Sequence, residues 1–298
     1  MSKLTSLLNE KPVVVADGAW GTELARRGLP AGAAPELWNA ERPDEVRAVA
    51  ASYVAAGSDV ILTNTFGGSP PKLAKAGLEG RCDELNRLGA ELSKEAAGGG
   101  GDTALVIASV GPTGELLEPL GTLTEGDAVS FFARQICALA AGGADGVVME
   151  TFIDLAEAKA ALRAAKEATD LPAVVSMTFE KGAAGYATVM GVTPERAAKE
   201  LTAAGADAVG ANCGSGIDNM VDVARLLRPA TDLPVWIKPN AGMPELVDGE
   251  TVFRQTPEEM VARVADLVAA GASVIGGCCG TTPEHIRAIV AEVRRLSS

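Results

Sequence analysis

Residues 141–151 read AGGADGVVMET, a pair of glycines followed by a short apolar run that ends in a carboxylate. The preceding stretch, SFFARQICALA, is amphipathic, which is typical of a helix, and Gly143 supplies the left-handed conformation that ends one. The run GVVME is short and rich in β-branched residues, which indicates a buried strand. These residues therefore predict a helix, its stop and a strand in immediate succession.

The same unit recurs along the chain. A helix that ends in glycine also precedes three other apolar runs, at Gly57, Gly205 and Gly271, whereas two further runs follow the sequence TDLP. This alternation indicates a weak internal repeat of two units. The eight apolar runs are VVVADG from Val13, VILTNT from Val60, ALVIASVG from Ala104, GVVMET from Gly146, AVVSMTF from Ala173, AVGANC from Ala208, VWIKPNAG from Val235 and SVIGGCCG from Ser273.

Eight strand–helix units in under 300 residues match the size of a TIM barrel. We therefore predict an α/β fold, a (β/α)8 TIM barrel, as a single domain over residues 1–298. An open, doubly wound sheet is the alternative, but it needs a GxGxxG turn after the first strand, and DGAWGTELA is not one. The glycine-rich residues 96–102, AAGGGGD, are expected to form a flexible connection before the third strand.

Composition restricts the possible partners. The chain has 39 acidic and 26 basic residues, a net charge of −13, which disfavours nucleic acid and anionic membranes as partners.

The N-terminus lacks the features of a signal peptide, and no long apolar run is present, so a soluble, cytoplasmic protein is expected. Five cysteines, an odd number, fit a reducing compartment and thiols kept for metal or chemistry. A single histidine excludes a histidine-based metal triad.

Every predicted strand ends in polar or thiol residues, at the barrel face where active sites form. Ser109, Thr178 and Lys238, taken singly, are explained as solvated strand ends. Glu150 and the cysteines follow apolar runs directly, where a lone carboxylate or thiol is harder to explain. The strand-end residues are Asp17, Asn64 with Thr65, Ser109, Glu150, Thr178, Asn212 with Cys213, Lys238 with Asn240, and Cys278 with Cys279.

Three thiols are expected to meet at one level of the barrel. Cys213 ends the sixth strand and Cys278 with Cys279 ends the eighth, and alternate strands contribute to the same layer. Three thiolates form a zinc site with one open position, which is the catalytic arrangement. Adjacent cysteines reach one ion only if the backbone turns, and the neighbouring glycines permit that turn. A strained disulfide between the adjacent pair and buried inert thiols remain alternatives.

The other two cysteines and the histidine have simpler explanations. Cys82 and Cys137 lie on predicted helices and are expected to be inert. His285 follows Thr282 and Pro283, a pairing typical of a helix N-terminus, and is expected at the start of the last helix.

The motifs DGAWGTEL, SDVILTNTFG, VGPTGE, GGADGVVMET, GANCG, KPNAG and GGCCGTTPEHI occur in this order over nearly the whole chain. Together they resemble the homocysteine S-methyltransferase family, in particular bacterial betaine–homocysteine methyltransferases and the N-terminal homocysteine domain of cobalamin-dependent methionine synthase. The resemblance implies an enzyme, a zinc-bearing TIM barrel that methylates the sulfur of homocysteine to give methionine. The sequence leaves a related thiol open as the acceptor.

The resemblance also assigns roles to residues. It implies that Cys213, Cys278 and Cys279 hold zinc and that Glu150 holds the ammonium of the substrate. Asp17 and Gly18 would cradle its amino-acid part, and Asn212, beside the first thiol, is included among the substrate-binding residues. Asn240 is a candidate fourth metal ligand when substrate is absent.

The expected chemistry agrees with three thiolate ligands. A free thiol, with a pKa of about 8.5, is mostly protonated at neutral pH, and the thiolate is the nucleophile. Coordination to zinc deprotonates the acceptor thiol. Because three anionic sulfurs already outweigh the charge of Zn²⁺, the bound thiolate keeps enough electron density to attack a methyl group.

The methyl donor is less well defined. A small onium donor such as betaine or S-methylmethionine needs aromatic side chains around its cation; the candidates are Trp38, Phe66, Tyr186 and Trp20, in a chain that is 4% aromatic. The alternative donor is a methylcorrinoid on a separate protein, since no cobalamin domain fits in 298 residues.

Two other classes of protein are less well supported. A metal-dependent aldolase or isomerase would need harder metal ligands, and a noncatalytic zinc module would need a fourth protein ligand.

Overall fold

The computed structural model describes residues 2–98, 104–247 and 250–297. Its main sheet has eight strands in the order β1-β12-β9-β8-β5-β4-β3-β2, and every neighbouring pair is parallel. A parallel bridge between Ala16 and Val60 joins the two edge strands and closes the barrel. The strands are β1 (Val14–Val15), β2 (Val60–Ile61), β3 (Leu105–Val110), β4 (Gly146–Phe152), β5 (Ala173–Met177), β8 (Ala208–Cys213), β9 (Val235–Pro239) and β12 (Val274–Ile275). All eight predicted strands, and the barrel itself, are confirmed.

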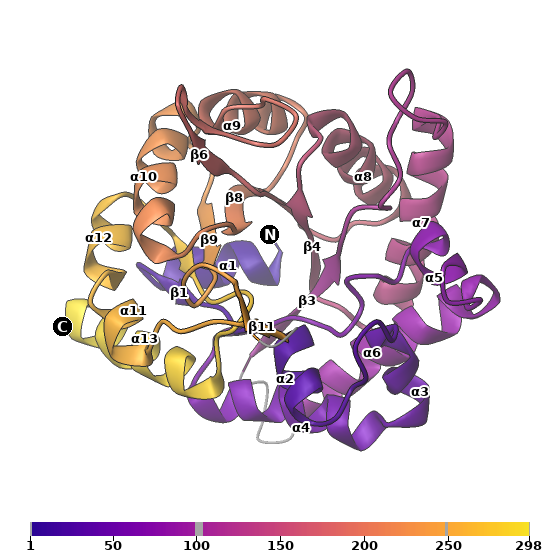
Figure 1. Cartoon of the computed structure of the whole chain (residues 1–298), viewed down its shortest axis with the longest axis horizontal. Coiled ribbons are helices and arrows are strands. Elements are labelled where there is room, and N and C mark those ends of the chain that lie inside the picture. The colour runs from indigo at the N-terminus through magenta and orange to yellow at the C-terminus, as the bar shows by residue number, and fades with distance from the viewer. Residues whose placement is uncertain (1, 99–103, 248–249, 298) are drawn as a thin grey trace.

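Helices form a ring outside the barrel, as the view down its axis shows (Figure 1). The helices of this outer layer and the loops are α2 (Gly21–Arg26), α3 (Trp38–Glu41), α4 (Pro43–Ala56), α5 (Pro70–Ala74), α6 (Cys82–Gly98), α7 (Glu125–Ala141), α8 (Leu155–Ala168), α9 (Pro194–Ala203), α10 (Ile217–Leu227), α11 (Pro257–Val261), α12 (Val264–Ala269) and α13 (Pro283–Leu296). Three short 3-10 turns, η1 (Pro35–Leu37), η2 (Glu79–Arg81) and η3 (Arg228–Ala230), complete the helical part. The predicted flexible segment, residues 96–102, lies largely outside the described residues.

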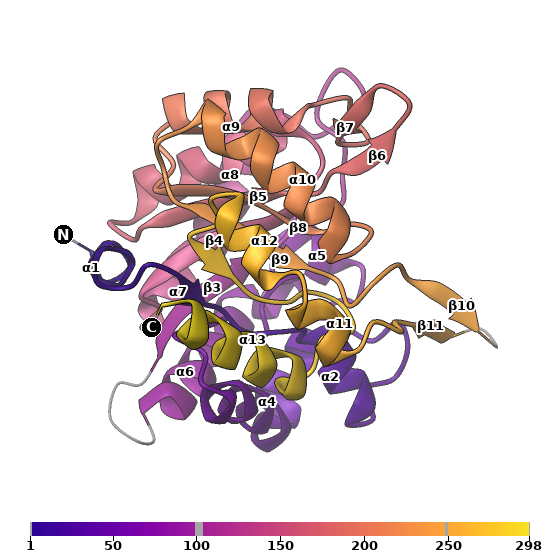
Figure 2. The same cartoon turned by 90° about the vertical axis from the view of Figure 1, so that its left-hand side faces the viewer.

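The first helix, α1 (Lys3–Glu10), lies across one end of the barrel (Figure 2). Leu4 of this helix is 2% exposed and packs in the apolar cluster that fills the barrel interior. Alternate strand residues supply that cluster, so Val14 points inward while Val15 packs in the larger core beneath the outer helices. The interior is therefore solid, and chemistry is restricted to the opposite end.

A repeated hydrogen bond explains the alternating sequence units. The residue before the second, fourth, sixth and eighth barrel strands accepts a hydrogen bond through its side chain. The donor is the backbone N–H of the first or second residue of the preceding barrel strand. The donors and acceptors are Val15 to Asp59 (2.9 Å), Val106 to Asp145 (3.0 Å), Ala173 to Asp207 (2.7 Å) and Val235 to Ser273 (3.3 Å). The glycine that ends each preceding helix is left-handed, with φ of 97° at Gly57, 86° at Gly143, 91° at Gly205 and 93° at Gly271. The predicted repeat and its glycine stops are confirmed.

Two small hairpins stand at the carboxyl-terminal end of the barrel. One pairs β6 (Glu180–Gly182) with β7 (Gly185–Ala187), and the other pairs β10 (Glu245–Val247) with β11 (Glu250–Val252). Both project on the side away from α1 (Figure 2). Within the described part of the chain, none of the helices combines the length and the apolar character needed to cross a lipid bilayer.

Candidate active site

A pocket of about 620 Å³ opens at the carboxyl ends of the barrel strands. Side chains that the sequence placed at separate strand ends line it together. They are Ser109 of β3, Glu150 of β4, Cys213 of β8, Lys238 of β9, and Cys278 and Cys279 after β12. The topology thus gathers residues that are up to 170 positions apart in the chain around one cavity (109 against 279).

The three thiols meet on one wall of this pocket. The sulfur of Cys213 lies 3.2 Å from that of Cys278 and 4.0 Å from that of Cys279, and all three lie within 4.8 Å of one another. Sulfurs held about 2.3 Å from one zinc ion at tetrahedral angles are about 3.8 Å apart, so the cluster fits a single ion. All five cysteines are free thiols, and the disulfide alternative is therefore wrong.

The thiols share protons when no metal holds them. Hydrogen bonds from Cys213 and Cys278 lower the pKa of the Cys279 thiol to about 4. The same contacts raise the pKa of the Cys213 thiol, because its proton is held between two sulfurs. One sulfur of the cluster is thus already a thiolate, which favours a cation beside it.

A strained backbone aims these side chains. Among the described residues other than glycine, positive φ angles occur only at Thr151 (65°) and Cys213 (62°), and a β-branched residue rarely adopts this conformation. Asn212 ties the two strained positions together: its Oδ1 accepts from the Thr151 N–H (2.8 Å) and from the Ser176 hydroxyl (2.7 Å). Its amide donates to the Thr151 hydroxyl (2.7 Å) and toward the sulfur of Cys278 (3.8 Å). Strain held in this way is typical of functional sites.

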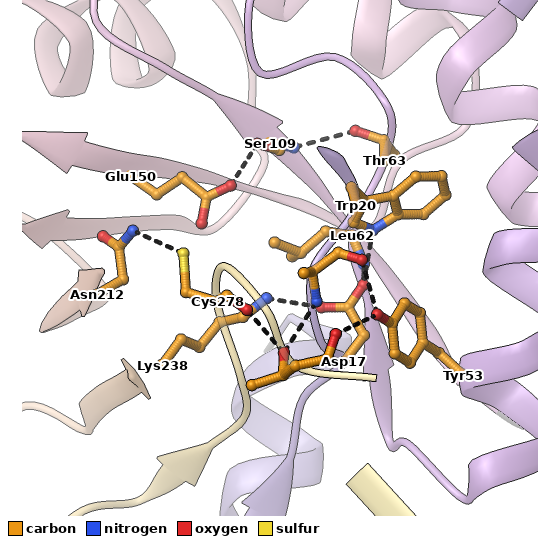
Figure 3. A network of polar contacts seen from close by, with 12 residues as sticks. Asp17, Trp20, Tyr53, Leu62, Thr63, Ser109, Glu150, Asn212, Lys238 and Cys278 are labelled. Carbon is orange, nitrogen blue, oxygen red and sulfur yellow. Dashed lines mark hydrogen bonds and ion pairs between the residues drawn. The ribbon is translucent and has the colours of Figure 1, made fainter. Parts of the chain in front are cut away.

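Glu150 stands beside this strained position. The register between β4 and β5 shifts between Met149 and Phe152, and Glu150, which lies between them, lines the pocket. Figure 3 shows its carboxylate beside Ser109. The hydroxyl of Ser109 donates a hydrogen bond to it. Burial raises the pKa of the Glu150 carboxyl to about 7, although the charge of Lys238 opposes the shift. A second positive charge would ionise this carboxylate fully.

A buried ion pair joins Lys238, which lines the pocket, to Asp17 behind it. The ammonium of Lys238 is 2.6 Å from Oδ1 of Asp17, and the two residues are 1% and 0% exposed. The other carboxylate oxygen of Asp17 accepts from the Trp20 indole (2.8 Å) and from the Leu62 backbone (2.7 Å). Burial opposes the charge of Lys238, but Asp17 and Glu150 together keep the pKa of Lys238 above its ordinary value. The explanation of Lys238 and Ser109 as solvated strand ends is therefore wrong, because both are buried.

Comparison with known proteins identifies the chain. Residues 14–293 match the homocysteine S-methyltransferase family. The chain belongs to this family. It is 30% identical to the methionine synthase of Mycobacterium tuberculosis over 310 aligned positions, and 31% identical to that of Mycobacterium leprae over 302. The matches cover 98% and 96% of this chain but 25% and 24% of those proteins, so it spans about a quarter of the length of the curated relatives it matches.

Solved structures of the homocysteine S-methyltransferase family superpose closely on this fold. The metallated form of the Escherichia coli homocysteine methyltransferase MmuM has a TM-score of 0.80 at 26% identity, covering 97% of this chain and 99% of that one. Its oxidized form has a TM-score of 0.78 at 27% identity, covering 97% and 98%. A pyruvate carboxylase of Rhizobium etli, at 15% identity and a TM-score of 0.54, shares the fold alone.

The remaining predicted family residues occupy different depths of the site. Gly18 lines the pocket, and a side chain there would lie 2.8 Å from both Tyr53 and Thr281, so only glycine fits. Asp17 and Asn212, both 0% exposed, lie behind the pocket wall and orient its residues. Asn240 donates to the Gly214 carbonyl (2.7 Å), while its buried Oδ1 has no hydrogen-bond partner among the described residues.

The aromatic candidates separate into two groups. Phe66 and Trp20 line the pocket. Trp38 is 8% exposed and packs under the guanidinium of Arg42. The hydroxyl of Tyr186 donates a hydrogen bond to Asn219 (2.9 Å). Neither residue lines the pocket. Which aromatic residues line the pocket could not be predicted from sequence, because all of them follow strands or lie in loops.

The two thiols and the imidazole outside the site lie on helices, as predicted. Cys82, at the start of α6, is buried, whereas Cys137 on α7 is exposed. His285 lies in the first turn of α13 and caps it, where its Nδ1 accepts from the Thr282 backbone N–H (3.2 Å). The prediction for His285 is confirmed.

Proposed function

We propose that this protein transfers a methyl group to the sulfur of homocysteine and so forms methionine, with residues 1–298 acting as one homocysteine-binding barrel domain. The observation that carries the proposal is the convergence of three thiols and Glu150 on one pocket in a member of the homocysteine S-methyltransferase family. An aldolase or isomerase would need oxygen and imidazole ligands, which this cluster lacks.

The donor set suits zinc. Cys213, Cys278 and Cys279 would hold the ion, and the separations of their sulfurs match tetrahedral coordination with one position left for another ligand. When bound, the zinc would lower the pKa of the acceptor thiol and keep it as a nucleophilic thiolate. In the absence of acceptor, we propose the unpartnered Oδ1 of Asn240 as the fourth ligand.

The chain's own residues would orient the acceptor. The carboxylate of Glu150 would bind the ammonium group, since the approaching cation lowers the pKa of a carboxyl that burial has raised to about 7. Gly18, without a side chain, leaves its backbone open to the amino-acid carboxylate. Asp17 would act through Lys238 and Trp20, whose side chains it holds in place, and Asn212 would act through Thr151 and the thiols.

Once the acceptor thiol is deprotonated, methyl transfer requires mainly that the acceptor sulfur and the donor methyl group are aligned. The acceptor sulfur, having lost its proton, attacks the methyl carbon in line with the bond to the donor atom. As the new carbon–sulfur bond forms, the electron pair of the old bond leaves with the donor, which departs as a neutral amine or sulfide. Holding both reactants about 3 to 3.5 Å apart in this geometry supplies several kcal/mol of the rate enhancement.

A small onium compound such as betaine or S-methylmethionine is the proposed donor. Phe66 and Trp20 line the pocket and offer aromatic faces to a cation. A methylcorrinoid carried by a separate protein is the second candidate, favoured by the match to two mycobacterial methionine synthases.

A panel of methyl donors tests both candidates. Zinc-loaded protein would be incubated with homocysteine and with betaine, a dimethylsulfonium carboxylate, S-methylmethionine or methylcobalamin, and methionine would be measured by mass spectrometry. We expect methionine with at least one onium donor and none with the Cys213→Ser variant. Methionine from methylcobalamin alone would select the second candidate, and no methionine from any donor would overturn the proposed acceptor.

A further inference from the structure

A second set of charged side chains lines the same pocket and has no part in acceptor binding. Glu36 of η1 and Lys72 and Lys75 of the α5 region line it, together with Phe66 from the loop after β2. None of these residues contacts the thiols or Glu150 through a hydrogen bond or ion pair within the described chain. They form a separate subsite, here called the lysine subsite.

The two lysines converge on one turn. If Gly114 carried a Cβ, that atom would lie 3.2 Å from the ammonium of Lys72 and 3.4 Å from that of Lys75. Lys75 also contacts Glu115 (2.9 Å), but its side chain is 56% exposed, so this ion pair is weak. In the described parts of the chain, no carboxylate oxygen lies within 4.0 Å of the Lys72 ammonium. Two cations therefore meet at a glycine whose φ of 77° excludes most side chains.

Phe66 rests on the same loop. A Cβ at Gly111 would lie 2.6 Å from its ring, so the aromatic side chain packs directly on bare backbone. The ring remains 37% exposed and faces the pocket. The motif VGPTGE thus places an aromatic face at its first glycine and two ammonium groups at its second.

Glu36 places a carboxyl group against the backbone of the residue that follows Phe66. It is only 2% exposed, and its Oε1 accepts a hydrogen bond from the backbone N–H of Gly67, the residue after Phe66 (2.6 Å). Burial raises the pKa of this carboxyl, while backbone hydrogen bonds and the charge of Lys72 oppose the shift. A cation bound nearby would favour the ionised carboxylate, and the Phe66 ring can hold a cation that donates no hydrogen bonds.

We propose that the lysine subsite binds a zwitterionic onium carboxylate, with its methyl-bearing cation against Phe66 and Glu36 and its carboxylate on Lys72 and Lys75. This inference rests on the proposed function and selects the chemical class of the donor. The acceptor side of the pocket carries the carboxyl group of Glu150, which would repel a second carboxylate. The donor carboxylate therefore points to the lysines, which directs the methyl end toward the thiols. A pocket of about 620 Å³ is large enough for two molecules of amino-acid size.

A pair of donors that differ in the charge of the carboxylate tests the role of the lysines. Initial rates would be measured with the onium carboxylate that is active in the donor panel and with its methyl ester, for the wild type, Lys72→Met and Lys72→Arg. We expect the KM for the carboxylate to rise by about 10- to 100-fold in Lys72→Met and to recover largely in Lys72→Arg. The KM values for the ester and for homocysteine should stay within about twofold. Lys199→Met, an exposed lysine on α9, is the matched control.

Binding without turnover gives an independent measurement. The carbon isostere 3,3-dimethylbutanoate has the shape and the carboxylate of betaine but no transferable methyl group, and calorimetry would compare its Kd with that of its uncharged amide. We expect the wild type to bind the carboxylate more tightly than the amide by about tenfold or more, and Lys72→Met to abolish the difference. Methionine formation together with equal effects on carboxylate and ester would overturn the subsite while leaving the proposed function intact. Failure of every donor in the wild type would instead overturn the proposed function.

Discussion

The ammonium of Lys238 lies 2.6 Å from the carboxylate of Asp17, although the two residues are 221 positions apart in the chain. Both side chains are buried, and β12 lies between β9, which carries Lys238, and β1, which Asp17 follows. Asp17 in turn holds the Trp20 indole and the Leu62 backbone. The ion pair and these two hydrogen bonds thus connect the ends of β1, β2 and β9, where Gly18 and Trp20 line the pocket.

Removing one partner of this pair should be costly. Lys238→Met leaves the carboxylate of Asp17 buried without a counter-ion, and we expect the free energy of unfolding to fall by about 3–5 kcal/mol. The double variant Asp17→Asn with Lys238→Met should recover part of the loss, because no uncompensated charge remains. Urea unfolding measures both, with Lys199→Met as the surface control. A loss below about 1 kcal/mol in Lys238→Met would show that the pair does not hold the site together.

The stability of the metal-free protein should depend on the ionisation of Glu150. Burial raises the pKa of this carboxyl from 4.5 to about 7, so the folded protein binds the proton more tightly than the unfolded chain does. The free energy of unfolding therefore falls as pH rises from about 4.5 to about 7, by about 3 kcal/mol in full, and stays low above that range.

Substitution of Glu150 by glutamine keeps a neutral side chain of the same shape and removes this titration. We expect Glu150→Gln to exceed the wild type in stability above pH 7 and to differ little from it below pH 4.5. Urea titrations across this range measure the difference, and Glu258→Gln, at an exposed site on α11, is the control. Parallel pH profiles for the wild type and Glu150→Gln would contradict the expectation.

The metal content should follow the three clustered thiols. We expect about one zinc per chain by elemental analysis. The zinc content should fall strongly in Cys213→Ser, because the proposed site needs all three thiolates as ligands. Cys137→Ser is the matched control, since its thiol is exposed on α7 and lies outside the cluster. Chelation should lower the Tm of the wild type and leave that of Cys213→Ser nearly unchanged. Equal zinc content in both variants would contradict the cluster as the metal site.

The opposite end of the barrel should affect stability without affecting activity. Asp207 accepts a hydrogen bond from the backbone N–H of Ala173 (2.7 Å) and pairs with Lys166 (2.6 Å). Asp207→Ala should lower the free energy of unfolding by about 1 kcal/mol and leave methyl transfer unchanged. Lys166→Met removes only the exposed ion pair and so measures its separate contribution to the free energy of unfolding, which should be small. A change in KM for homocysteine in Asp207→Ala would show that the two ends are coupled.

Most of the fold and the thiol site could be predicted from sequence. The glycines that end helices, the short β-branched runs and the capping residues of α13 act within a few positions, so local patterns reveal them. The convergence of Cys213 with Cys278 and Cys279 also follows from topology, because the carboxyl ends of parallel barrel strands meet at one face.

Burial and partner choice were decided by the tertiary structure. Lys238 looked like a solvated strand end, and Ser109 like an unremarkable hydroxyl, until the barrel placed them against Asp17 and Glu150. Phe66 and Trp38 were equivalent candidates in sequence, but only Phe66 faces the pocket, because Gly111 leaves room for its ring. Periodicity determines which residues form each strand. The charge, exposure and contacts of a side chain depend on residues a hundred or more positions away, and those are fixed only when the barrel closes.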